Sequence, residues 1–164
     1  MRETDCALAA DAKVETPEGP MAIRTVVGKA IAVFTRDPGG RVRFRIMQNV
    51  RKILEQQPVL KLTLENGRTV RVGPAQVLFK YGMVACRADA LCVGDDLECA
   101  FHFPAGYEFT DDRTHTRRVS SRCLRLTAIE PGGAADLYAL GVHQSHCFML
   151  TAGVLCKAEE TAAP

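Results

Sequence analysis

Apolar and polar residues follow one another along this chain in short alternating runs, a pattern typical of β-strands. Helical periodicity is nearly absent, and the runs are KVET, KAIAVFT, RVRFRIM, PVLKLTLE, RTVRV, QVLFKY, DLECAF, CLRLTAIE, DLYALGV, HCFML and GVLC. Turn signals separate them: PEG, DPGG, ENG, KYG and EPGG. Two of these signals, ENG at 65–67 and DPGG at 37–40, stand between alternating runs and predict hairpins. Many short strands separated by such turns predict an all-β domain.

Two brief segments, 22–28 and 86–94, are the only helix-like pieces. They belong to an internal repeat, because GPMAIR at 19–24 resembles GMVACR at 82–87. Each copy is followed by a short apolar turn, a glycine and a strand, and this shared order favours duplication of one supersecondary unit. The polar segment 104–121, PAGYEFTDDRTHTRRVSS, is interpreted as a surface loop between the two halves.

The composition is that of an ordinary globular domain. A length of 164 residues favours one domain, and 47% apolar residues is too many for a disordered chain. With 21 basic and 19 acidic residues, the chain gives no electrostatic reason to bind nucleic acid. The polar start MRETD and the short apolar runs predict neither a secretory signal nor a membrane span, so we expect a cytoplasmic protein. Most of the seven cysteines, which form no CxxC pair, are then expected to be reduced thiols.

Three segments, in this order, resemble the Hint superfamily of inteins, bacterial intein-like domains and hedgehog autoprocessing domains. They are CALAADAKVETPEGPMAIRTVVGKAIAVF, NGRTVRVGPAQVLFKYG and LYALGVHQSHCFMLTAGVLCKA. The resemblance implies a Hint-like domain over 6–158, with an N-terminal flank at 1–5 and a C-terminal tail at 159–164. It also implies an all-β horseshoe of two pseudo-twofold-related halves built from many short strands, which agrees with the internal repeat.

The family's chemistry begins with a cysteine that attacks the preceding carbonyl, and the resemblance makes Cys6 that nucleophile at the Asp5–Cys6 bond. The family's Thr-Pro-x-His turn, which supplies an acid or base, here runs from Gly73 to Gln76. Gly73 has no hydroxyl, and Gln76 can donate a hydrogen bond but cannot deliver a proton near neutral pH. A missing acid or base costs roughly 10²–10⁴-fold, so we expect a badly impaired N-to-S acyl shift.

The family's last step is cyclisation of a terminal Asn, and here the terminal pair is degenerate. Lys157 and Ala158 stand on the usual His-Asn pair, or Cys156 and Lys157 if the match slips by one residue. Neither pair holds the side-chain amide that forms a succinimide. His146 matches the upstream His that assists this step, which makes it the second candidate catalytic residue.

Two further departures complete the degenerate pattern. Glu159 stands where the acceptor thiol or hydroxyl is expected, and Ala139 replaces an Asp found in many inteins. Together they predict a domain without splicing or C-terminal cleavage. Hedgehog-type cholesterol transfer is equally doubtful, because it needs the same Thr and His.

Other interpretations of the cysteines and histidines stay open. The residue types suit zinc, and the candidate ligands are Cys6, His143, His146, Cys147 and Cys156. Neighbouring strand residues point to opposite faces, so His146 and Cys147 would rarely reach one metal ion. A Cys6–Cys156 disulfide or redox pair is another alternative, and simple packing beside an old active-site pocket is the plainest one. We expect no metal and no cofactor.

Three functional hypotheses follow. The first is a degenerate Hint domain that acts only on its own chain, with residual N–S acyl shift or N-terminal cleavage at Cys6. It would be a monomer whose only partner is the flanking polypeptide of its precursor, without nucleic acid or membrane. The second is a non-catalytic β-rich binding or structural module. The third is active autoprocessing by an unconventional route, with Cys147 or Cys156 as a second nucleophile.

Overall fold

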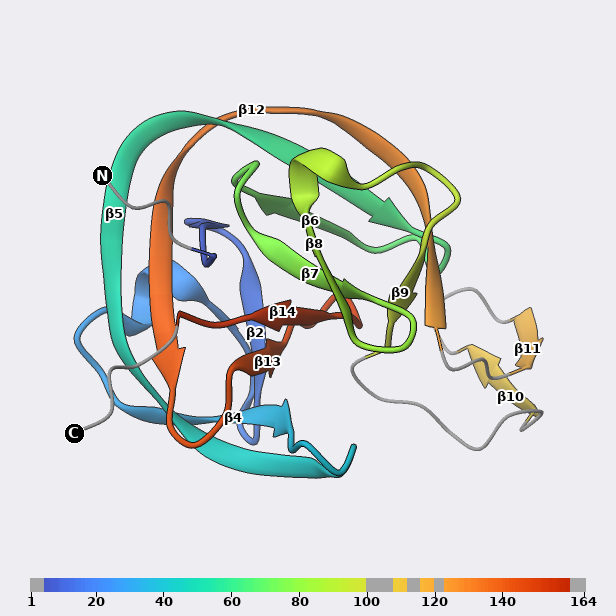
Figure 1. Ribbon diagram of the computed structural model, residues 1–164, viewed down its shortest axis with the longest axis horizontal. Helices are drawn as coiled ribbons and strands as arrows, with labels where there is room; N and C mark the ends of the chain where they lie inside the picture. The colour runs from blue at the N-terminus through green and yellow to red at the C-terminus, as the bar shows by residue number, and fades with distance from the viewer. Residues whose placement is uncertain (1–4, 100–107, 112–115, 120–122, 160–164) are drawn as a thin grey trace.

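Two long antiparallel strands, β5 (Val42–Leu64) and β12 (Cys123–Val142), form the frame of the molecule. The structure, a computed structural model, describes residues 5–99, 108–111, 116–119 and 123–159. Figure 1 shows the two strands as neighbouring arcs that curve around the remaining strands. Strands and two short 3-10 turns make up the regular structure of the described residues, which confirms the all-β prediction. Within these residues, no helix is long and apolar enough to cross a membrane.

The shorter elements form two similar series and a closing pair. The first series is β1 (Leu8–Ala9), β2 (Lys13–Thr16), β3 (Gly19–Ala22), η1 (Ile23–Val26) and β4 (Ile31–Arg36). The second is β6 (Thr69–Val72), β7 (Val77–Lys80), β8 (Val84–Arg87), η2 (Ala88–Ala90) and β9 (Asp96–Glu98). The chain closes with β13 (Cys147–Met149) and β14 (Leu155–Lys157). The large sheet has the order β13-β14-β7-β9-β12-β1-β6-β5-β4, with β8 beside β7.

The many short strands are confirmed, but β5 and β12 each run through more than one of the segments that the pattern separated. The EPGG signal lies inside β12, where the pairing with β5 shifts register between Pro131 and Ala134. A bulge therefore replaces the predicted turn, and bulges bend a strand without ending its pairing. In β5, Asn49 and Gln56 have positive φ angles of 57° and 45°, and the pairing with β12 shifts register along this stretch as well. These irregularities let two continuous strands curve where the pattern predicts breaks.

Equivalent hydrogen bonds relate the two series and support the predicted pseudo-twofold symmetry. The backbone N–H of Ile23 donates to the C=O of Ala12, and the N–H of Ala88 donates likewise to Gln76. Gly28 and Gly94, which follow the two 3-10 turns, each donate to a long strand and have φ angles of +72° and +98°. Such angles favour glycine, which explains the glycine shared by the two copies.

The repeat read from the sequence has the correct order but a shifted register. Its letters match Arg24 with Arg87, whereas the hydrogen bonds match Arg24 with Asp89, because these two N–H groups bind Ala10 and Pro74. The connection between β7 and β8, residues 81–83, is one residue longer than residues 17–18 between β2 and β3, and this accounts for one of the two positions of the shift. The predicted hairpins at 37–40 and 65–67 are confirmed, since each joins two paired strands.

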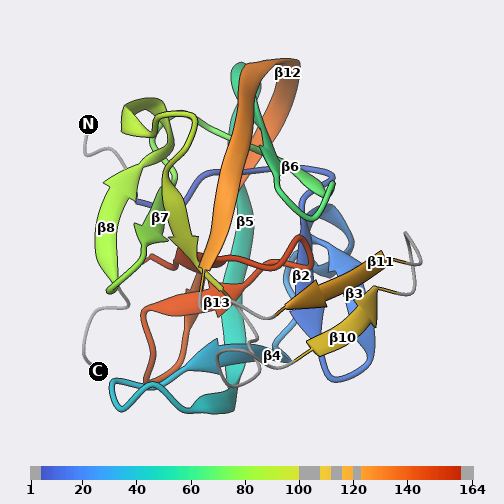
Figure 2. The same cartoon turned by 90° about the vertical axis from the view of Figure 1, so that its right-hand side faces the viewer.

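The polar segment 104–121 does not lie between the halves, because it connects β9 with β12 inside the second half. Part of it, β10 (Glu108–Asp111) and β11 (Thr116–Val119), forms a separate two-stranded sheet. Figure 2 shows this pair to one side of the large sheet. The remainder of the segment lies outside the described residues, as does His115.

Both ends of the domain meet the turn between β6 and β7. β1 pairs with β6 and β12, so the chain start lies beside the beginning of that turn. β14 pairs with β7 through Cys156 and Leu78, so the last strand lies beside its end. Apolar side chains from both halves form the buried core around this junction. The fold thereby brings the three segments that the Hint resemblance identified to one place.

Candidate functional site

The backbone on either side of Cys6 is held by the turn between β6 and β7. The C=O of Asp5, the carbonyl that a Cys6 thiol would attack, accepts a hydrogen bond from the N–H of Val77 at 2.9 Å. The C=O of Ala7 accepts one from the N–H of Gly73 at 2.7 Å. A backbone N–H that faces a reacting carbonyl stabilises negative charge on its oxygen, so Val77 is positioned as an oxyanion-type donor.

Gln76 is fully buried and ties the chain start to the last strand. Its side-chain Oε1 accepts the N–H of Ala7 at 2.7 Å. Its Nε2 donates to the C=O of Val77 at 2.9 Å and to the C=O of Lys157 at 3.1 Å. Both amide hydrogens are therefore used, and a neutral amide neither gives nor takes a proton near pH 7. At the position matched to the family's histidine, the Gln76 side chain therefore makes hydrogen bonds that hold backbone segments together.

Gly73 leaves little space for a side chain. A Cβ at this position would lie 3.0 Å from the Cβ of Ala7 and 3.1 Å from a methyl carbon of Leu137. The family's Thr at this position would thus push against the strand that follows Cys6. Ala139, another departure, is fully buried in β12 opposite Arg51 of β5.

The environment of Cys6 strongly favours the protonated thiol over the thiolate. Complete burial raises the pKa of Cys6 to about 12. A backbone hydrogen bond of Leu140 lowers this pKa, the negative charge of Glu159 raises it, and the positive charge of Arg51 lowers it again. At pH 7 only about one thiol in 10⁵ is then ionised, and the thiolate is the reactive form.

The two ends of the domain are joined by ion pairs. The Nζ atom of Lys157 lies 2.8 Å from an Oδ atom of Asp5. The guanidinium of Arg51 binds both carboxylate oxygens of Glu159, each at 2.8 Å. Ala158, between the two charged residues, is fully buried and donates its N–H to the C=O of His146 at 2.8 Å.

His143 and His146 are exposed, and the backbone carbonyl of His146 accepts a hydrogen bond from the closing segment. The catalytic role of His146 stays a prediction. Across residues 5–99, 108–111, 116–119 and 123–159, no three His, Cys, Asp or Glu side chains are placed to hold a metal ion. The zinc alternative for Cys6, His143, His146, Cys147 and Cys156 therefore has no assembled ligand set.

No disulfide links the seven cysteines, all of which lie among the described residues. Cys147 and Cys156 are buried, as is Cys6. Burial raises the pKa of Cys156 well above its usual value, and the neighbouring Cys6 and Cys147 thiols add to the rise. The three sulfur atoms thus occupy one region, and no disulfide joins them.

Sequence reasoning identified Cys6, Gly73 and Gln76 but missed the charged residues around them. Arg51 lies in a long strand with no motif, and Glu159 was noted only as a lost acceptor. The local pattern carries no signal that could pair two residues 108 positions apart. As assembled, the site places the Val77 N–H on the Asp5 carbonyl beside Cys6, and the buried Gln76 side chain offers no group that titrates near pH 7.

Similarity to known proteins is structural. No protein-family description and no curated protein matches the sequence. The Ssp DnaB mini-intein variant M86 superposes with a TM-score of 0.76 at 13% identity, covering 99% of both chains. The DnaB intein from Synechocystis sp. PCC 6803 gives 0.72 at 13% identity, covering 94% of this chain and 99% of the intein. The DnaX mini-intein from Spirulina platensis gives 0.66 at 12% identity, covering 93% and 99%. The chain therefore has the Hint fold of the mini-inteins, as its sequence motifs predicted.

Proposed function

We propose that this chain is an intein-like domain that lacks splicing and C-terminal cleavage and retains at most a slow N–S acyl shift at Cys6. The observation that supports this most directly is the position of Gln76. Its amide occupies the place of the family's acid or base and is engaged by three backbone groups. The site keeps the parts that position the Asp5–Cys6 bond and lacks those that move protons.

The retained step is an exchange within one peptide bond. The Cys6 sulfur bonds to the carbonyl carbon of Asp5, the bond from that carbon to the Cys6 nitrogen breaks, and the thiol proton ends on that nitrogen. The N–H of Val77 would stabilise the oxygen as charge develops. A thiol pKa of about 12 and a missing acid make the step slow at neutral pH.

The C-terminal half of the family's reaction has no equivalent side chain here. Ala158 has no amide to cyclise, and the side chain of Lys157 is paired with Asp5. A slip of one residue would place Cys156 and Lys157 at the cleavage position, with the same result. We therefore expect no release of a fragment after residue 158.

A reporter protein joined to the N-terminus of the full chain tests the acyl shift. Hydroxylamine attacks a thioester, so it should release the reporter ending at Asp5 as a hydroxamate, over hours to days, and restore the Cys6 thiol. Intact mass measurement identifies both products. Cys6→Ala should abolish the cleavage, while Cys92→Ala, at an exposed position, should leave it unchanged.

A fusion that stays intact in hydroxylamine over days would contradict residual acyl-shift chemistry. The second candidate, a non-catalytic β-rich binding or structural module, would then be favoured. The complete burial of Cys6 and the full use of the Gln76 amide support this candidate, because together they resemble a packed core. A fragment that begins after residue 158 would contradict the proposal at its other end.

A further inference from the structure

The segment that follows β14 lies over the Cys6 thiol. Glu159 donates its backbone N–H to the C=O of Leu140 at 2.8 Å and forms a parallel bridge with Gly141. Backbone hydrogen bonds of the same two residues, Leu140 and Glu159, act on the Cys6 thiol, which is completely inaccessible. The burial of the nucleophile thus includes contacts made by the last described residue of the chain.

This segment lies beyond the end of the strand pairing of β14. β14 ends at Lys157, and its Cys156 pairs with Leu78 on one side and with Phe148 on the other. Beyond the strand, Ala158 donates its backbone N–H to the C=O of His146, and Glu159 donates its backbone N–H to the C=O of Leu140. Ala158 is also buried in the core, so the segment separates from Cys6 only when this small side chain leaves the core, whereas β14 can keep its place in the sheet.

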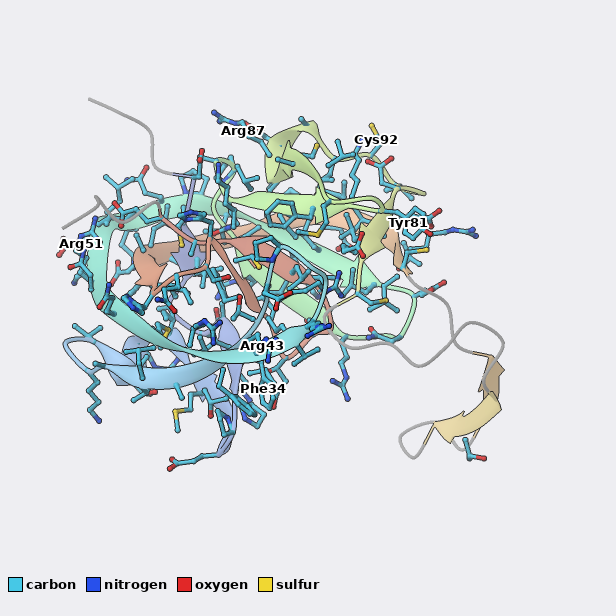
Figure 3. The ribbon with its side chains drawn as sticks, turned by 60° about the horizontal axis from the view of Figure 1, so that its bottom comes forward. Phe34, Arg43, Arg51, Tyr81, Arg87 and Cys92 are labelled. Carbon is cyan, nitrogen blue, oxygen red and sulfur yellow. The ribbon has the colours of Figure 1, made fainter. Side chains whose placement is uncertain are left out.

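The side chain of Glu159 supplies the strongest further attachment. The two oxygens of its carboxylate bind the two terminal nitrogens of Arg51 at 2.8 Å each. Charge-assisted bidentate pairs of this kind are among the stronger hydrogen bonds in proteins. The Arg51 side chain is 40% exposed and the Glu159 side chain 29% exposed, so water and salt reach the pair. Figure 3 shows Arg51 at the end of the molecule opposite β10 and β11.

We propose that Arg51 and Glu159 form a latch that holds residues 158–159 over Cys6, and that opening the latch gives the thiol access to solvent and reagents. The closed latch also acts through charge, because the Glu159 carboxylate disfavours the Cys6 thiolate. The positive charge of Arg51 also acts on the pKa of Cys6, and the Cys6 and Cys147 thiols act on the pKa of Cys156. Access to Cys6 would then be controlled by one ion pair at the surface.

The inference rests on the proposed function only where it treats Cys6 as the nucleophile of the acyl shift. Exposure of the thiol is a separate property that can be measured in the unmodified chain. The two can therefore fail independently.

Alkylation by iodoacetamide tests the latch directly. The Cys6 thiolate forms a bond to carbon and iodide leaves, and peptide mass spectrometry gives the rate at each cysteine. Glu159→Gln and Arg51→Ala should each alkylate Cys6 about tenfold faster than the wild-type chain, as expected for loss of a charged, bidentate pair. Sodium chloride at about 1 M should accelerate the wild-type reaction and have little further effect in the variants, because salt screens exposed ion pairs.

Two buried thiols serve as internal references. Cys156 reports loosening of β14, and Cys99 reports unfolding of the second half of the molecule. The latch predicts that only Cys6 becomes faster. Asp89→Asn breaks a similarly exposed ion pair, Arg87–Asp89, on another part of the surface and should leave Cys6 unchanged. Arg51→Lys keeps one charge without the bidentate geometry, and its Cys6 rate should lie between wild type and Arg51→Ala.

Two results would overturn the latch. The first is that Cys6 in Glu159→Gln is alkylated at the wild-type rate. The second is that the alkylation rates of Cys6, Cys156 and Cys99 rise together, which would indicate general unfolding. The reporter fusion carrying Glu159→Gln separates the latch from the proposed function. If Cys6 becomes readily alkylated but hydroxylamine still releases no reporter, the latch stands and the acyl shift is refuted.

Discussion

The two halves of the molecule contain the same backbone turn with different side chains. In the first half, the N–H of Ala12 donates to the C=O of Ala9 at 2.9 Å, and in the second, the N–H of Gln76 donates to Gly73 at 3.0 Å. At the two ends of the first turn, Ala9 and Ala12 carry small apolar side chains that pack in the core. The second turn also receives the chain start, and this added contact accounts for its glycine and its buried amide.

A second pair of residues that differs between the two series also connects the halves. Arg36 ends β4 in the first series and Glu98 ends β9 in the second. Their side chains form an ion pair at 2.8 Å that is almost completely buried, and Glu98 also accepts the N–H of Gly82 at 2.8 Å. The two series have similar backbones, and Arg36 and Glu98 are differing residues through which they contact each other.

Of the variants considered, one that breaks the Arg36–Glu98 ion pair between the halves should lose the most unfolding free energy. Glu98→Ala leaves a buried guanidinium without its carboxylate partner, which typically costs about 3–5 kcal/mol of unfolding free energy. Urea unfolding at pH 7 measures the loss.

Glu98→Gln provides the matched control, because it keeps an acceptor for the N–H of Gly82 while it removes the charge. It should cost less than Glu98→Ala. At the surface, Asp89→Ala breaks an exposed pair and should cost less than about 1 kcal/mol. Equal effects of Glu98→Ala and Asp89→Ala would show that the buried pair does not join the halves.

Gln76→Ala makes the second turn resemble the first and should have the next largest effect. It leaves the N–H of Ala7 and the carbonyls of Val77 and Lys157 without this partner. Since each unsatisfied buried group costs about 1–3 kcal/mol and water can enter part of the space, we expect a loss of about 2–4 kcal/mol. Ala12→Gly tests the corresponding position in the first half and should cost about 1 kcal/mol. Chemical denaturation of both variants compares them, and similar losses would mean that the two turns contribute alike.

The smallest predicted effect concerns alkaline pH. The pKa of Cys6 is about 12 in the folded chain and about 9.0 for an ordinary thiol, so the folded state holds the proton more tightly. The resulting stability is complete below about pH 9 and is lost as the pH rises toward 12. Between pH 8 and pH 10, Cys6 should account for a loss of about 1.4 kcal/mol.

Urea unfolding of Cys6→Ala at pH 8 and pH 10 measures how much of the loss of unfolding free energy comes from Cys6. The variant should still lose some stability, because burial also raises the pKa of Cys99 to about 12 and that of Cys156. Cys92→Ala, at an exposed position, should lose as much as the wild type. If Cys6→Ala shows the wild-type pH dependence, the buried-thiol account is wrong.

Local signals predicted the features that depend on neighbouring residues. The hairpins at 37–40 and 65–67, and the glycines that follow the two 3-10 turns, depend on backbone angles that few residue types adopt. EPGG carries the same kind of signal, yet its backbone forms a bulge inside β12 because β5 continues to pair beside it. A turn signal indicates an unusual backbone conformation, and the partner strand decides whether the chain reverses there.

The sequence by itself determined the all-β class, the order of the Hint-like segments and the chemistry absent at the aligned positions. No arrangement in space can give Gly73 a hydroxyl, Gln76 a side chain that titrates near pH 7 or Ala158 a side-chain amide. Only the tertiary structure decided which groups meet around Cys6: the Val77 N–H on the Asp5 carbonyl, the three partners of Gln76, and the Arg51–Glu159 pair. Apart from the bond between Gln76 and its neighbour Val77, these contacts join residues 69 to 108 positions apart, and they form only when the two halves close into one sheet. Side-chain composition is a local property of the chain, whereas the partners of a charged or amide group depend on the complete fold.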